Sequence, residues 1–435
     1  MRKGNGKKAA FHTLGCKVNQ YETAGMTEMF RSRGYDIVGE HEFADVYVIN
    51  TCTVTAMADR KSRQYIRRMK KLNPRAIVAV TGCYVQISPD DVEAIEGVDI
   101  IAGMDEKHRI VELVEGTQAG KSPEKDDFVE MGPVTSAENR TRAYIKIQEG
   151  CNRFCSYCII PYARGRLRSR PPENIVEEAA ALIDAGYREL VLTGINTALY
   201  GMEKDPDNFG LEPVVAAVNE LEGDFRIRLS SLEPAVVNGE YVKRLFQYDR
   251  LCHHLHMSAQ SGSDTVLERM NRPYGRDGYM ELVNALRQFD PNYGISTDII
   301  VGFPGETHGD FRDSCRLIEE SRFCRTHVFK YSKRPGTAAA DMDGQIDSKI
   351  KNERSEELIK LAESTSEDFF RVNINTVRRV LTEEMSPDGK YFIGYSDNYI
   401  KTYIPFDDKI KLNSFVSVRL MSLMRDGMEG KADEM

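Results

Sequence analysis

Short apolar runs alternate with helix-like stretches over the first part of the chain. Three of these runs end in a cysteine, at Cys16, Cys52 and Cys83. The stretches between them, residues 19–33 and 56–72, have the periodicity of amphipathic helices. Successive cysteines lie roughly 30 residues apart, which is the length of one βαβ unit. The pattern predicts a parallel-sheet α/β domain over residues 7–120, with each cysteine just past the carboxyl end of a strand.

The alternation continues in longer units over residues 137–370, after a polar linker containing Pro and Gly over residues 121–136. The predicted strands are residues 143–148, 189–193, 226–230, 255–258, 295–301 and 326–329. The predicted helices are residues 173–185, 213–221, 276–289 and 310–321. Six β/α units predict a partial (β/α)6 barrel, with its active site at the carboxyl ends of the strands.

The period changes after a charged helix predicted over residues 350–371. Alternating apolar and polar side chains, interrupted by turn residues, occupy segments 376–381, 391–404 and 415–421. This pattern predicts a small antiparallel β-barrel over residues 371–435. Tyrosines recur every four residues there, and we expect most to pack and one or two to stack on bases: Tyr391, Tyr395, Tyr399 and Tyr403.

Composition narrows the classes of function. The 435-residue chain carries a net charge of −8, so nucleic acid could be bound only through local basic patches. No apolar run is long enough for a membrane span, and the basic start is not followed by the apolar stretch of a signal peptide. We therefore expect a cytoplasmic protein without a membrane partner. In that compartment, nine cysteines favour metal sites over disulfides.

The most closely spaced candidate metal ligands are Cys151, Cys155 and Cys158, which form a C-x3-C-x2-C motif. Thiolates suit iron–sulfur clusters, zinc or copper(I). A cubane cluster normally takes four thiolates, so three would leave one iron open. The alternatives are a zinc knuckle, for which the second pair of cysteines is missing, or reactive surface thiols. The spacing favours a 4Fe–4S cluster held by these three residues.

Cys16, Cys52 and Cys83 favour a second cluster. Strand ends in an open α/β sheet meet at the edge where ligands gather, so the three thiols should converge in space. The alternative is that they are buried as small hydrophobic residues, which we expect for the remaining Cys252, Cys315 and Cys324.

The cysteine motifs carry a family resemblance. The loop around Cys151, Cys155 and Cys158 resembles that of the radical S-adenosylmethionine (SAM) superfamily, in which SAM binds the open iron and is cleaved to a 5′-deoxyadenosyl radical. The sequences Leu-Gly-Cys-Lys-Val-Asn, Asn-Thr-Cys-Thr-Val and Thr-Gly-Cys-Tyr-Val around the other three cysteines resemble the methylthiotransferase family. The resemblance implies two 4Fe–4S clusters, the second of which carries the sulfur to be transferred. It also implies that the C-terminal segment is a TRAM domain, an RNA-binding β-barrel.

Candidate SAM contacts follow the predicted barrel strands. Gly, Ser and Pro clusters usually mark ordinary turns, but four of them at strand ends in register with the cysteine loop favour a SAM pocket. In the family, similar segments contact SAM. On this resemblance, the residues expected to contact SAM are Thr193, Gly194, Asn196, Glu233 and Gln260. The histidines of the fourth predicted strand are interpreted as strand-end or core residues rather than metal ligands: His253, His254 and His256.

Two basic stretches are candidates for phosphate contact. Residues 60–75 contain eight Lys or Arg and no acid, although most charge runs are solvated helix faces. Four arginines follow the cysteine loop and could bind phosphate or form salt bridges within the barrel: Arg164, Arg166, Arg168 and Arg170.

The leading functional hypothesis rests on the resemblance. The opening motif is similar to that of the family type that adds a methylthio group to carbon 2 of threonylcarbamoyladenosine, next to the tRNA anticodon. Expected partners are the tRNA anticodon stem-loop, an electron donor such as a flavodoxin, and a sulfur donor. The alternatives are methylthiolation of isopentenyladenosine, methylthiolation of a ribosomal-protein aspartate, and a non-catalytic electron-transfer or cluster-scaffold role.

Overall fold

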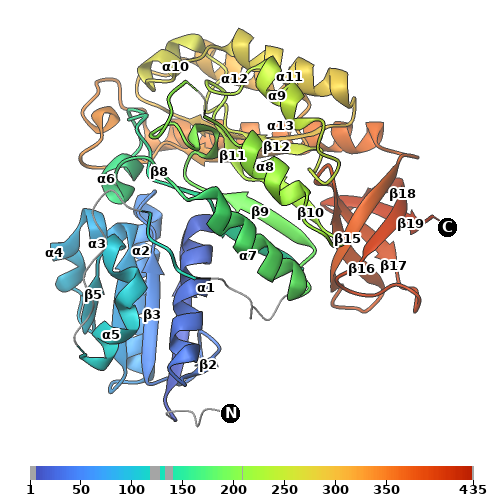
Figure 1. The fold of residues 1–435 in the computed structure, drawn as a ribbon. Coiled ribbons are helices and arrows are strands. Elements are labelled where there is room, and N and C mark those ends of the chain that lie inside the picture. The colour runs from blue at the N-terminus through green and yellow to red at the C-terminus, as the bar shows by residue number, and fades with distance from the viewer. Residues whose placement is uncertain (1–5, 118–127, 133–140, 208, 434–435) are drawn as a thin grey trace.

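The computed structural model describes residues 6–117, 128–132, 141–207 and 209–433, which form three units along the chain (Figure 1). Most of the predicted linker, residues 121–136, lies outside the described residues. Its described part packs on the N-terminal unit, where Met131 is buried in the core.

The N-terminal unit is the predicted parallel sheet. Its strands occur in the order β2-β1-β3-β4-β5, and every pairing is parallel. The strands are β1 (Lys8–Thr13), β2 (Asp36–Val38), β3 (Val46–Thr51), β4 (Ile77–Gly82) and β5 (Ile100–Ala102). The helices are α1 (Lys17–Ser32), α2 (Ala56–Leu72), α3 (Cys83–Ile87), α4 (Pro89–Glu93) and α5 (Ile110–Glu115), with a 3₁₀ turn η1 (Met104–Arg109). The sequence pattern missed β2 and β5, which are too short to show a period.

The central unit is a partial barrel of parallel strands. The two sheets have the orders β10-β9-β6 and β11-β12-β13-β14, and β11 follows β10 directly, so the strands curve in chain order. The strands are β6 (Arg142–Lys146), β9 (Glu189–Thr193), β10 (Arg226–Leu229), β11 (Ser231–Leu232), β12 (His254–Met257), β13 (Gly294–Val301) and β14 (Arg325–Lys330). The six β/α units are confirmed, although the third predicted strand ends at Leu229 and the short strand β11 follows it after Ser230.

Helices cover the outer face of this barrel (Figure 1). They are α7 (Pro172–Asp184), α8 (Glu212–Asn219), α9 (Gly239–Leu245), α10 (Asp264–Arg269), α11 (Arg276–Phe289), α12 (His308–Ser321) and α13 (Ser348–Val372). The buried faces of all of these helices except α10 pack with the strands into one large apolar core, and Val266 of α10 belongs to a separate apolar cluster. No helix of the described ranges is both long and apolar enough to cross a membrane.

The C-terminal strands close into a small barrel in the order β15-β16-β17-β19-β18. The strands are β15 (Val377–Met385), β16 (Tyr391–Ser396), β17 (Lys401–Pro405), β18 (Phe415–Met424) and β19 (Gly427–Ala432). All pairings are antiparallel except that of β17 with β19. A turn with Tyr399 at φ 71° separates β16 from β17 within the apolar segment 391–404.

This small barrel docks on the amino ends of the central strands. Arg226 and Arg228 of β10 donate hydrogen bonds to the backbone carbonyls of Tyr395 and Ser396, at 3.0 and 3.1 Å. Both guanidiniums also pair with the buried Glu189 of β9, at 2.6 and 3.0 Å. The carboxyl ends of the strands, which carry the cysteine loop, therefore remain clear of the C-terminal unit.

Candidate functional site

The loop that carries Cys151, Cys155 and Cys158 lies between β7 (Gln148–Glu149) and α6 (Ile160–Arg164). Its backbone is fixed from two sides. Ser156 donates to the carbonyl of Arg269, at 2.8 Å. Gly150 has φ 69°, and a Cβ there would lie 1.8 Å from the carbonyl oxygen of Arg166, so only glycine fits. Cys155 is buried and the other two thiols are half-buried, as expected for ligands presented at the edge of a cavity.

A cavity of about 200 Å³ opens beside this loop, and all three thiols line it. Three of the predicted SAM contacts line it too: Asn196, Glu233 and Gln260. The amide of Asn196 donates to Glu233 at 2.6 Å. Residues that the sequence analysis did not select complete the lining, since Arg153 pairs with Glu233 at 2.7 Å and Arg272 donates to the sulfur of Cys155 at 3.2 Å.

The lining of this cavity fits the amino-acid end of SAM. Two of its buried atoms, Oδ1 of Asn196 and Oε1 of Glu233, have no hydrogen-bond partner among the described residues, although Nη1 of Arg272 lies 3.6 Å from the latter. Buried polar atoms are normally satisfied, so unpaired ones in a cavity indicate a ligand. The carboxylate can accept from an ammonium, and the guanidiniums of Arg153 and Arg272 can bind a carboxylate.

Thr193 and Gly194 do not line the cavity but lie next to residues that position its wall. Thr193 is buried in β9, and its carbonyl accepts from the amide of Ile147 at 2.8 Å. A Cβ on Gly194 would lie 2.8 Å from Oε1 of Gln148. That oxygen also accepts the backbone amide of Asn196 at 2.8 Å. Gly194 therefore allows a buried glutamine to position the backbone that leads to Asn196.

The three N-terminal cysteines meet at the carboxyl edge of their sheet. Cys16 precedes α1, Cys52 follows β3 and Cys83 begins α3. A Cβ on Gly15 would lie 2.8 Å from the sulfur of Cys52, which places the Cys16 loop against that thiol. Burial and the neighbouring Cys83 thiol raise the pKa of Cys52 to about 12, and Cys16 contributes in the same direction. Such thiols would lose their protons on metal binding.

Two buried asparagines hold these loops together. Asn19 donates to the carbonyls of Leu14 and Thr51, at 2.6 and 3.0 Å, and so joins the loops of Cys16 and Cys52. Asn50 in turn donates to the carbonyl of Asn19, at 3.0 Å. Gly82, before Cys83, has φ 104° and would place a Cβ 2.3 Å from the carbonyl of Thr51. Neither asparagine was predicted as a site residue, nor was Gly82, although each stands beside a cysteine.

Arg164 connects the two sets of cysteines. Its guanidinium is completely buried, pairs with Glu149 and Glu22 at 2.7 and 2.9 Å, and donates to Asn19. Its positive charge opposes the rise that burial causes in the pKa of Cys83. The N-terminal sheet and the barrel loop therefore share one buried charge network, which Lys107 and Lys146 complete.

This geometry corrects part of the predicted phosphate site. Arg164 and Arg170 are buried in ion pairs, the latter with Glu130 at 2.6 Å and with Glu178. These two arginines therefore form salt bridges, which was the alternative to phosphate contact. Arg166 is exposed and Arg168 is half-buried.

A second cavity of about 230 Å³ adjoins the first and extends toward the N-terminal unit. The two share Tyr157, Cys158, Ile160 and Gln260. Its far wall includes Val54 and Thr55, which come just after Cys52. A molecule in this cavity would lie between the barrel cysteine loop and the segment that follows Cys52.

Lys17 extends from the N-terminal unit toward the barrel. The charges that act on its ammonium come from four barrel strands, namely Arg228, Arg142, Glu189 and Asp298. Burial, followed by the two arginines, lowers the pKa of Lys17 to about 8. Because strands from both sheets of a curved barrel contribute, Lys17 lies on the concave side. It forms no ion pair with a residue of the described ranges.

The histidines behave as expected for strand and core residues. His254 is buried and lies 3.0 Å from the hydroxyl of Ser296, and His256 lies 3.0 Å from Asp298. His253 contacts Asp290 at 2.8 Å. Within the described ranges, no three His, Cys, Asp or Glu side chains could hold a single metal ion. In a cubane each thiolate binds a different iron, so its ligands do not converge on one atom.

Comparisons with known proteins agree with this site. Residues 8–103 match the model described as "Uncharacterized protein family UPF0004", and residues 145–318 match that of the radical SAM superfamily. The chain is 43% identical to a threonylcarbamoyladenosine tRNA methylthiotransferase MtaB of Bacillus subtilis, over 90% of this chain and 89% of the relative. The corresponding protein of Thermotoga maritima is 39% identical, over 97% and 96% of the two chains.

More distant relatives include a tRNA-2-methylthio-N(6)-dimethylallyladenosine synthase of Clostridium tetani, 32% identical over 96% of this chain and 95% of the relative. Among solved structures, the radical SAM methyltransferase TsrM of Kitasatospora setae has a similar fold, with a TM-score of 0.54 and 16% identity over 77% of each chain. With both domain models, both sets of cysteines and full-length relatives in agreement, the chain belongs to the radical SAM methylthiotransferase family.

Proposed function

We propose that this chain is a cytoplasmic tRNA methylthiotransferase that adds a methylthio group to carbon 2 of threonylcarbamoyladenosine next to the anticodon. The observation that carries the proposal is a pair of adjoining cavities, one lined by Cys151, Cys155 and Cys158 and the other reaching Val54 and Thr55, just after Cys52. The relatives of 37–43% identity that bear the threonylcarbamoyladenosine name support the choice of substrate.

Two 4Fe–4S clusters and SAM are the cofactors, and each set of cysteines would hold one cluster. The barrel set would be Cys151, Cys155 and Cys158, with Asn196 and Glu233 at the amino-acid end of SAM. The N-terminal set would be Cys16, Cys52 and Cys83. In this family the cofactors supply an organic radical that can remove an unactivated hydrogen, together with the sulfur that replaces it.

The protein's own side chains would position the substrate. The threonylcarbamoyl group carries a carboxylate, whereas a dimethylallyl group is uncharged. Lys17, on the concave side of the barrel and without an ion-pair partner in the described ranges, would pair with this carboxylate. This observation favours threonylcarbamoyladenosine over the dimethylallyl alternative.

The exposed face of α2 would bind RNA. Six cations of residues 60–75 are exposed and lack hydrogen-bond or ion-pair partners in the described ranges: Arg60, Lys61, Arg67, Arg68, Lys71 and Arg75. Arg63 and Lys70 are instead engaged with Tyr84 and Asp99. Since α2 begins beside the second cavity, a bound anticodon stem-loop could reach from α2 to the site. These cations count against a protein substrate.

The three units would be an N-terminal cluster-binding domain over residues 7–120, a radical SAM domain over residues 137–370 and a C-terminal domain over residues 371–435. The closed C-terminal barrel supports its assignment as a TRAM-like RNA-binding domain. An electron donor such as a flavodoxin and a sulfur donor would complete the set of partners. A cluster scaffold would not need a cavity in which Oδ1 of Asn196 and Oε1 of Glu233 lack hydrogen-bond partners among the described residues.

Nucleoside mass spectrometry of tRNA from cells with and without this protein tests the proposal. We expect the methylthio form of threonylcarbamoyladenosine to disappear from the deletion strain and to return with the wild-type gene. Loss of a methylthio dimethylallyladenosine instead would assign the other substrate. If every methylthiolated nucleoside persists, tRNA is not the substrate.

Cysteine variants test the division of labour in the same protein. Anaerobically reconstituted wild type should hold about eight irons, and the triple variant Cys16→Ala/Cys52→Ala/Cys83→Ala about four. That variant should still cleave SAM on reduction but form no methylthiolated nucleoside. Cys155→Ala/Cys158→Ala should abolish reductive cleavage. A folded N-terminal triple variant that still methylthiolates tRNA would show that this cluster does not carry the sulfur.

A further inference from the structure

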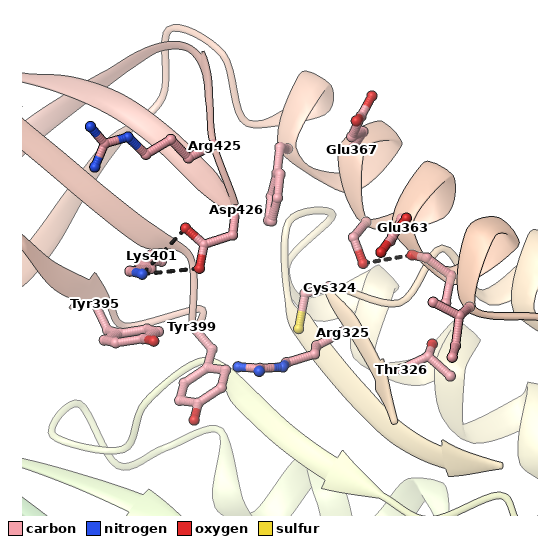
Figure 2. A pocket seen from close by; sticks show the side chains of 14 residues that line it. Cys324, Arg325, Thr326, Glu363, Glu367, Tyr395, Tyr399, Lys401, Arg425 and Asp426 are labelled. Carbon is pink, nitrogen blue, oxygen red and sulfur yellow. Dashed lines mark hydrogen bonds and ion pairs between the residues drawn. The ribbon is translucent and has the colours of Figure 1, made fainter. Parts of the chain in front are cut away.

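A larger cleft lies far from both sets of cysteines, where the C-terminal barrel meets the central unit (Figure 2). Its volume of about 530 Å³ is within the range of ligand sites. Helix α13 forms one wall, the start of β14 another, and the turns that follow β16 and β18 the third. The cysteine loop, by contrast, lies at the carboxyl ends of the barrel strands.

An aromatic surface forms part of the cleft. The rings of Tyr395 and Tyr399 stack with centroids 5.2 Å apart and planes at 29°. Other side chains hold the two rings in place. Arg142 lies over Tyr395 at 5.5 Å, Arg228 lies over Tyr399 at 4.9 Å, and His254 stacks on Tyr399 at 4.4 Å. Both tyrosines remain partly exposed and line the cleft.

Two arginines flank this surface, and the guanidinium of one of them, Arg425, lies over the ring of Tyr403 at 5.4 Å. Arg325 begins β14 and Arg425 lies in the turn between β18 and β19, and both are exposed. Neither forms a hydrogen bond or an ion pair with the described part of the chain. Lys401 differs, because it pairs with Asp426 at 2.9 Å. Figure 2 shows Arg325 directed toward Tyr399 and Arg425 on the barrel side of the cleft.

The wall formed by α13 offers acceptors instead. Glu363 has no hydrogen-bond or ion-pair partner within the described ranges, and Oγ1 of Thr326 is buried without a partner there. Glu367 is paired with Arg371 at 3.1 Å. An occupant must therefore present an anionic group to the arginines and hydrogen-bond donors to the opposite wall.

We propose that this cleft binds one unstacked nucleotide of the tRNA, outside the modified position, whose base carries an exocyclic amino group. The base would lie against the exposed edges of the tyrosine pair, because Arg142, Arg228 and His254 cover the outer faces of the two rings. Its phosphates would contact Arg325 and Arg425, and its amino group would donate to Glu363. Uracil lacks that amino group, so the cleft discriminates against it. The inference rests on the proposed tRNA substrate.

Equilibrium binding of the full chain to unmodified tRNA and to oligocytidine and oligouridine of about eight nucleotides tests the cleft. The double variant Arg325→Ala/Arg425→Ala should bind tRNA about tenfold more weakly at 0.15 M salt. Two lost single-strand phosphate contacts should lower the slope of log affinity against log salt by about 1.4. The matched control Lys409→Ala/Lys411→Ala removes two exposed charges from the same barrel outside the cleft and should bind like wild type.

Glu363→Gln tests the base preference separately. Wild type should favour oligocytidine over oligouridine, and this variant should lose most of the preference while keeping its thermal midpoint. The inference is wrong if the double variant binds tRNA with the wild-type salt slope, or if wild type binds both oligonucleotides equally. The cleft would then be a site for a protein partner. If wild type binds no tRNA at all, the proposed function itself fails.

Discussion

Lys17 and Arg164 show that the role of a buried charged side chain depends on whether it has an ion-pair partner. Both stand next to a cysteine motif in the sequence. Arg164 is completely buried, and its charge is balanced by Glu22 and Glu149. Lys17 lies among barrel strands without an ion pair inside the described ranges. Removal of the partners of a buried cation leaves an uncompensated charge, whereas a cation without a partner can pair with a ligand.

Replacement of Lys17 by methionine should therefore affect substrate recognition. We expect kcat/KM for tRNA with threonylcarbamoyladenosine to fall about tenfold or more, the effect of one lost charge-assisted hydrogen bond of about 1.5–3 kcal/mol. Iron content should stay at the wild-type value, and Lys17→Arg should restore part of the activity.

The discriminating control is tRNA in which the threonyl carboxylate is esterified. Wild type should use the ester poorly, and Lys17→Met should use acid and ester at similar rates. If both proteins discriminate equally between acid and ester, Lys17 does not contact the carboxylate.

Helix α2 has two different faces. Its inner face buries Tyr65, Ile66 and Met69 against the sheet. Near its amino end, Asp59 forms a buried ion pair with Arg334 of the central unit, at 2.6 Å. The outer face is basic and free of acids. The helix is thus fixed beside the cavity while it presents cations to solvent, which suits a rigid phosphate-binding surface.

The double variant Arg67→Ala/Arg68→Ala tests this surface. Each lost phosphate contact should lower the salt slope of tRNA binding by about one. The variant should keep its fold, because both side chains are exposed. Lys409→Ala/Lys411→Ala again serves as the charge-matched control. Unchanged affinity and salt slope in the α2 variant would make this basic face a solvated helix surface.

The whole molecule depends on contacts between units that lie far apart in the sequence. Glu22 of α1 meets Arg164 from the barrel loop, 142 residues away, at 2.9 Å. Arg164, Lys107 and Lys146 hold the pKa of Glu22 well below its usual value against the effect of burial. The N-terminal unit is therefore attached to the barrel by ionised groups in a buried interface.

Glu22→Gln should lower the stability of this interface at neutral pH. Loss of one partner in a buried ionic network costs about 3–5 kcal/mol. Because the folded pKa of Glu22 is depressed, its contribution is complete above the usual pKa near 4.5 and is lost as pH falls toward the folded value. Thermal midpoints of the metal-free protein should differ most at pH 7 and converge in acid. Parallel midpoints at every pH would mean that Glu22 does not stabilise the interface.

Local sequence determined the cysteine motifs and most of the secondary structure. Residues 56–72, 189–193 and 276–289 were predicted with the bounds that the structure gives. Period, strand length and motif spacing act within a few residues, so they can be recognised in a single chain. The parallel direction of the strands in both α/β units could be predicted because alternating strands and helices leave few arrangements.

Tertiary structure alone decided which side chains share a site. Arg272 contacts Cys155 although 117 residues separate them, and no motif marks it. The four arginines of residues 164–170 look alike in sequence, yet Arg164 and Arg170 are buried in ion pairs while Arg166 is exposed. The cleft between α13 and the C-terminal barrel likewise exists only because two units meet there. Burial and long-range pairing are properties of the packed chain, so a local pattern cannot specify them.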